Sequence, residues 1–88
     1  MSAALTYANE GAALADRLYT EPNRFHPSIH ATLAAAQLAN GDLAVAQRSW
    51  SRASELLATL NDPPPSVTGW VDEVRERLCE QTLACPSE

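Results

Sequence analysis

A helix–turn–helix pattern in the middle of the chain constrains the fold more than any other feature. Residues 33–60, LAAAQLANGDLAVAQRSWSRASELLATL, carry two alanine-rich helical patterns that only residues 40–42 separate. Gly41 suits the left-handed conformation that ends a helix, and the carboxylate of Asp42 can cap the next one. Small residues on both patterns would let two helices approach closely around Trp50. We therefore expect an antiparallel helical hairpin here.

The composition favours helix along the whole chain. The 88 residues include sixteen alanines, three glycines and few β-branched residues, and no run alternates apolar and polar residues as a half-buried strand would. A chain of this length suggests one domain, and such a domain buries only about 60% of the surface of its unfolded chain. We predict a single all-α domain over residues 1–88 with a thin core.

Apolar residues recur at helical spacing in four segments, which we place at about 3–19, 28–39, 43–60 and 67–83. The first segment has a wide apolar arc, which is typical of a helix that touches more than one neighbour. Residues 63–65 are three prolines and form a stiff spacer. The tail at 84–88 is expected to be flexible.

Three residues between the predicted helices have expected roles. Phe25 is expected to fold inward as a plug. Pro27 suits the first turn of the second helix, where a missing N–H costs nothing. Ser66 is expected to cap the fourth helix.

The charge of the chain excludes several classes of partner. The formal net charge is −5, the six arginines are scattered and lysine is absent. Nucleic-acid binding normally needs a clustered basic face, so we expect neither nucleic acid nor an anionic membrane as a partner. The N-terminus lacks an early positive charge and a continuous apolar run, unlike a signal peptide. No stretch approaches the ~20 apolar residues of a membrane span. We expect a cytoplasmic protein.

The residues that could carry chemistry do not form a recognisable site. His26 and His30 have the spacing of two metal ligands on a helix, but Pro27 would place His26 before the helix, so we expect the two side chains to diverge. Cys79 and Cys85 would lie on nearly opposite faces of a continuous helix, so a disulfide between them would require the helix end to unravel. We therefore predict no enzyme activity, no catalytic residue, no cofactor and no metal.

Residues 27–60 resemble a single tetratricopeptide repeat, whose period is about 34 residues. The positions that carry the resemblance are Leu33-Ala34, Gly41-Asp42, Ala46, Trp50 and Ala53. The flanking segments ALADRLYTEPNRFHPSI and LATLNDPPPSV are similar to the joins between variant repeats of kinesin-light-chain type. The resemblance implies an array of antiparallel hairpins with half a repeat, one full repeat and half of another. The alternative is a closed four-helix bundle.

The resemblance also implies a protein-interaction module or adaptor that binds a peptide or helix of a partner. About two repeats are too few to bury their own apolar faces, so a partner or a homodimer would cover the end helices. The family's groove positions, together with an arginine pair and one tryptophan, give the candidate partner-binding residues Ser28, Ala31, Thr32, Ala35, Leu38, Arg48, Arg52 and Trp70. The alternatives are a small regulatory or neutralising subunit for one dedicated protein target, and an accessory subunit of an enzyme.

Overall fold

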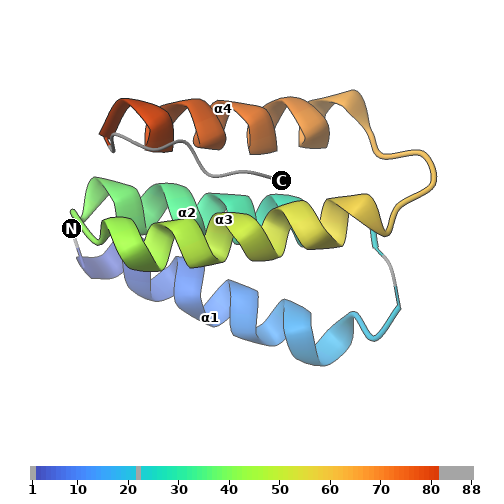
Figure 1. The fold of residues 1–88 in the computed structure, drawn as a ribbon. Coiled ribbons are helices and arrows are strands. Elements are labelled where there is room, and N and C mark those ends of the chain that lie inside the picture. Colours follow the sequence, from blue (N-terminus) through green and yellow to red (C-terminus); the bar gives the residue numbers. More distant parts are fainter. Residues whose placement is uncertain (1, 22, 82–88) are drawn as a thin grey trace.

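The computed structural model describes residues 2–21 and 23–81, which fold into four α-helices (Figure 1). The helices are α1 (Ser2–Leu18), α2 (His26–Ala39), α3 (Leu43–Ala58) and α4 (Pro65–Gln81). Consecutive helices run in opposite directions, and this part of the chain contains no strand, so the all-α prediction is confirmed. None of the described helices has the length and apolar character needed to cross a membrane.

Helices α2 and α4 each begin two residues before their predicted first residues, and proline explains both cases. α2 begins at His26, and Pro27 lies in its first turn as expected. α4 begins at Pro65, and the carbonyl of Pro64 accepts its first hydrogen bonds. A proline fits the start of a helix because it has no N–H to satisfy. Ser66 therefore lies inside α4, and the prediction that it caps the helix is wrong. The predicted flexible tail lies outside the described residues.

The turn between α2 and α3 is built around Gly41. Its φ is 87°, in the left-handed region that was predicted, and its N–H donates to the carbonyl of Leu38 at 3.0 Å. Asp42 directly precedes α3, but its side chain makes no capping hydrogen bond. Its carboxylate instead accepts a hydrogen bond from the Asn40 side chain at 3.1 Å. The predicted cap is therefore wrong, and the Asp42 side chain stabilises the turn itself.

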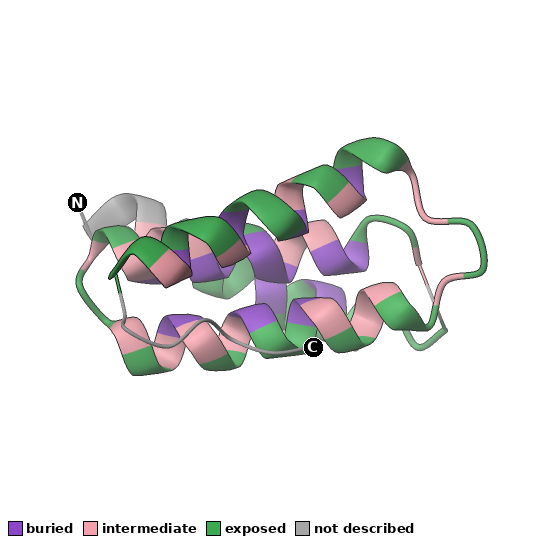
Figure 2. Cartoon of the chain, turned by 45° about the horizontal axis from the view of Figure 1, so that its top comes forward, coloured by how far each residue is buried: buried purple, intermediate pink, exposed green. Residues whose placement is uncertain are grey.

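The core is shared by α2, α3 and α4. Trp50 of α3 is 1% exposed, and its indole N–H donates to the carbonyl of Val71 on α4 at 2.9 Å. Between α2 and α3, the Ser49 hydroxyl donates to the Gln37 side chain at 2.6 Å. The core cluster consists of Ala31, Ala34, Ala46, Trp50, Ala53, Val71, Val74 and Leu78. Because most of these side chains are small, the helices come close enough to enclose one tryptophan, and the buried surface faces inward between them (Figure 2).

Helix α1 lies outside this core. Among the described helices α1 packs only against α2, and the core cluster contains no residue of α1. α1 and α4 lie on opposite sides of the α2–α3 hairpin (Figure 1). The expectation that the first helix touches more than one neighbour is therefore wrong. The described helices do not enclose one common core. They form an open array in which α1 is the outermost helix and contacts α2 but neither α3 nor α4.

Candidate functional site

Four of the predicted partner-binding residues lie along one surface, between α2 and α4. The indole N–H of Trp70 donates to the Thr32 hydroxyl at 3.1 Å, which joins the two helices at this surface. Farther along α2, toward its C-terminal end, Ala35 and Leu38 line a shallow groove of about 200 Å³. The other residues of this groove are Ala39, Arg77, Glu80 and Gln81. The residues that α2 contributes to the groove are apolar, and those that α4 contributes are polar.

The basic residue at this groove already has partners. Arg77 forms an ion pair with Glu73, one turn earlier on α4. Its guanidinium group also lies over the aromatic ring of Trp70, 5.2 Å from the ring centroid. Both partners belong to the same helix, so Arg77 is held against α4. The groove therefore offers a ligand apolar contacts from α2 and polar contacts from α4.

The remaining predicted residues are not part of this groove. Ala31 is fully buried in the core, where it has no exposed surface to offer a partner. Ser28 is half-buried, and its hydroxyl donates to the carbonyl of Phe25 at 2.8 Å. Arg48 and Arg52 are exposed on α3, and Arg52 lines a different pocket. The predicted set is thus divided between two surfaces and the core.

A cluster of three polar side chains links α1 to α2. His26 and His30 are buried, at 3% and 6% exposure, and their Nε2 atoms lie 2.7 and 2.8 Å from the same carboxylate oxygen, Oδ1 of Asp16. An ionised carboxylate only accepts hydrogen bonds, so both Nε2–H groups donate to it. The expectation that the two histidine side chains diverge is wrong. His26 is the first residue of α2, so both rings lie on one face of the helix, and both contact the same oxygen of Asp16.

Sequence reasoning missed Asp16 because its partners are on another helix. The signal that was present is the four-residue spacing of His26 and His30, which places both side chains on one face of a helix. Asp16 lies at the edge of the buried face of α1, one turn from the buried Ala12 and next to the buried Ala15. Only the antiparallel packing of α1 on α2 brings this edge to the histidines.

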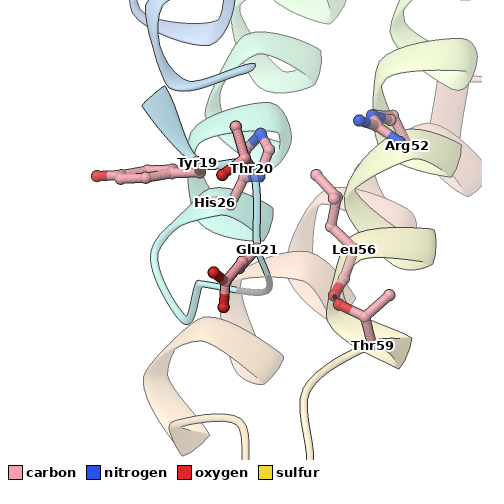
Figure 3. Close-up of a pocket in the computed structure, with 7 residues that line it drawn as sticks. All are labelled: Tyr19, Thr20, Glu21, His26, Arg52, Leu56 and Thr59. Carbon is pink, nitrogen blue, oxygen red and sulfur yellow. Dashed lines mark hydrogen bonds between the residues drawn. The ribbon is translucent and has the colours of Figure 1, made fainter. Parts of the chain in front are cut away.

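The cluster lies beside a pocket of about 210 Å³ (Figure 3). His26 belongs to one wall, and Arg52 and Leu56 of α3 form the opposite wall. The pocket is lined by Tyr19, Thr20, Glu21, His26, Arg52, Leu56 and Thr59. The Tyr19 ring packs edge-on against the ring of His26, with 5.4 Å between the centroids. One face of the cluster is thus packed, while the pocket leaves space next to His26.

The electrostatics of the cluster favour a charged carboxylate. Burial raises the pKa of Asp16, but the hydrogen bonds from His30 and His26 and the charges on these rings lower it more, so its pKa is below the ordinary value. The side chain of Asp16 remains 43% exposed, and those of His26 and His30 are 4% and 8% exposed. The carboxylate that both rings contact is therefore anionic, and the Asp16 side chain is partly open to solvent.

The outer face of α1 carries apolar side chains that nothing in the described chain covers. Tyr7, Leu14 and Leu18 are exposed, although α1 buries its opposite face against α2. Phe25, in the connector to α2, is also exposed, and the Arg24 guanidinium lies 5.1 Å from its ring centroid. The prediction that Phe25 plugs the core is therefore wrong.

One cysteine of the described chain is oxidised. Cys79, near the end of α4, is disulfide-bonded, a state that the sequence left open. Cys85 lies outside the described residues.

Comparison with protein-family models, with curated proteins and with solved structures finds no match to this chain.

Proposed function

We propose that the protein is a helical interaction module that binds through the outer face of α1, and that its partner is α1 of a second copy. One observation carries this proposal: Tyr7, Leu14 and Leu18 form an apolar row with exposed fractions of 74%, 47% and 65%. Monomeric proteins rarely leave large contiguous apolar patches exposed, and such patches usually mark interaction sites. A second helix would remove this row from water.

The spacing of the row suits pairing with itself. Positions 7, 11, 14 and 18 lie on one side of a helix, and their separations of four, three and four residues are the same in both directions. Two antiparallel copies of α1 would place Tyr7 opposite Leu18 and Gly11 opposite Leu14. A Cβ atom added at Gly11 would have no neighbour within 4 Å, so Leu14 of the second copy has room against the bare backbone. The interface would have two-fold symmetry.

The charges beside the row favour the same antiparallel arrangement. Glu10 and Arg17 are exposed, lie on the same flank of the row and form no ion pair within the described chain. Antiparallel pairing brings Glu10 near Arg17 of the second copy, and symmetry repeats the contact. Each exposed ion pair contributes about 0.2–1 kcal/mol, so the pairs mainly set the orientation.

The order of helix packing also supports an interaction module. α2 packs against α1, α3 and α4, and α3 packs against α4. The tetratricopeptide resemblance implies this order for half a repeat, a full repeat and half of another. In such arrays each repeat needs neighbours to bury its apolar surface. The described helices leave the groove between α2 and α4 uncovered in the proposed dimer, so an adaptor could bind a short segment of a protein partner there.

Sedimentation equilibrium of the purified protein tests the proposal. We expect a monomer–dimer equilibrium with a dissociation constant on the order of 1–100 μM, because the interface is small. Leu18→Glu places a charge in the apolar row and should give a monomer. Ala13→Glu adds the same charge at an exposed position on another side of α1, and this control should still form the dimer.

A charge-swap series tests the orientation. Glu10→Arg and Arg17→Glu should each weaken the dimer by about 2–10-fold, because each places like charges together twice. The double variant restores opposite charges and should recover the affinity of the wild type. A wild-type protein that remains monomeric at about 1 mM, or equal effects of Leu18→Glu and Ala13→Glu, would contradict the proposal.

A further inference from the structure

We propose that Asp16, His26 and His30 form a binding site for one divalent transition-metal ion, with Zn²⁺ as the occupant. This inference is independent of the proposed dimer, because Asp16 lies away from the apolar row of α1. One ligand atom from each of the three side chains lies within 4.8 Å of the other two. The two rings are one turn apart on α2, and both Nε2 atoms point at the same carboxylate oxygen.

The donor set fits zinc chemistry. Zinc binds imidazole nitrogen at about 2.0–2.1 Å and carboxylate oxygen at about 2.0–2.2 Å, usually in tetrahedral geometry. Neighbouring ligand atoms around such an ion are then roughly 3.3 Å apart. The observed distances from Asp16 Oδ1 to the two Nε2 atoms are 2.7 and 2.8 Å. The carboxylate oxygen therefore needs to move away from each ring by about 0.5 Å.

The structure allows this small separation on the side of Asp16. The Asp16 side chain is 43% exposed, whereas the side chains of His26 and His30 are 4% and 8% exposed. The buried rings are therefore the fixed part of the site, and the carboxylate is the part that can move. To bind an ion, each ring must release the hydrogen that Nε2 donates to Asp16, so that the Nε2 lone pair faces the ion and the remaining ring hydrogen is on Nδ1.

Three protein ligands leave a coordination position for water or another donor. His26 also lines the neighbouring pocket, whose lining includes the carboxylate of Glu21 (Figure 3). Zinc sites with three protein ligands keep their fourth position open, unlike closed structural sites with four. The ion would also connect α1 to α2, which is the only described helix that α1 packs against. Zinc would thereby strengthen the attachment of the outermost helix.

Zinc titration of the metal-free, untagged protein by calorimetry tests the site. The chain contains two histidines, and both belong to the proposed site, so no other histidine can contribute. We expect one Zn²⁺ per chain with a micromolar or lower dissociation constant, and a rise in Tm because the ion binds the folded state. Mg²⁺ prefers oxygen ligands and should produce neither effect.

Matched variants assign the ligands. His30→Gln should weaken zinc binding by about 100-fold or more, and Asp16→Asn by about 10-fold or more. Glu76→Gln removes an exposed carboxylate from α4 and should bind zinc like the wild type. Helical circular dichroism shows whether each variant is folded. Absence of zinc binding by the wild type at millimolar concentration would overturn the proposal, as would unchanged binding by folded His30→Gln.

Discussion

Single polar atoms connect the helices of this alanine-rich protein. The Trp50 indole reaches a carbonyl of α4, the Ser49 hydroxyl reaches α2, and the Asp16 carboxylate joins α1 to α2. A buried polar group that loses its partner costs about 1–3 kcal/mol. Apolar contacts between alanines distinguish poorly between alternative alignments, so these hydrogen bonds select one arrangement of the helices.

The two tryptophans should respond very differently to the same substitution. Trp50→Phe removes the buried N–H bond to Val71 and leaves unfilled space in the core, so it should cost about 1–3 kcal/mol of stability. Trp70→Phe loses a hydrogen bond at the surface and should cost less than about 1 kcal/mol. Urea unfolding followed by circular dichroism measures both. Equal losses would contradict the central role of Trp50.

The lowered pKa of Asp16 gives metal-free protein an acid-sensitive component of stability. A carboxyl whose folded pKa is depressed stabilises the protein above its unfolded value of about 3.9, and this contribution is lost as the pH falls through the lower folded value. The stability difference between wild type and Asp16→Asn should therefore shrink from about pH 5 downward. Urea midpoints measured with a chelator present test this. A difference that stays constant to about pH 2 would contradict it.

Sequence reasoning predicted single residues well where the cause was local. The left-handed Gly41 and the first-turn Pro27 follow from backbone sterics at one position. The site of Asp16, His26 and His30 depends on how α1 is aligned with α2, and no local pattern contains that alignment. Ala31 illustrates the same limit, because the family pattern placed it at a groove and the packing places it in the core.

At the scale of elements, the existence and type of the four helices could be predicted because their apolar spacing is clear. Their first residues were harder to predict. His26 and Pro65 begin helices because prolines tolerate the first turn, whereas the expected cap at Ser66 suggested a later start for α4. Asp42 had the right position for a cap, but its carboxylate accepts from Asn40 instead.

Two glycines should show opposite effects when replaced by alanine. Gly41 has a φ of 87° and open space around it, so Gly41→Ala should cost about 1–2 kcal/mol through backbone strain alone. Gly69 lies within α4 with equally open space, so Gly69→Ala should stabilise the protein by about 0.5–1 kcal/mol. Thermal unfolding measures both, at about 4–8 °C per kcal/mol for a domain of this size. Shifts of the same sign would contradict this explanation.

At the scale of the whole molecule, the position of α1 decides what the protein can bind. The wide apolar arc of α1 predicted that this helix packs against several neighbours. A closed bundle could bury these apolar side chains within one chain, and an open array could bury them against a partner. The sequence does not distinguish the closed bundle from the open array. The row containing Tyr7, Leu14 and Leu18 is suited to burial within one chain and equally to burial between two chains. Among the described helices α1 packs on α2 alone, and this row is exposed.

Nuclear Overhauser effects between two copies test the proposed α1 interface most directly. A mixture of isotope-labelled and unlabelled protein, measured with isotope filtering, detects only contacts between chains. Antiparallel pairing predicts contacts from the Leu14 methyl groups to Gly11 of the other copy, and from Leu18 to the Tyr7 ring. Intermolecular contacts confined to α4 or to the α2–α4 groove, or none at concentrations that saturate any dimer, would contradict the account.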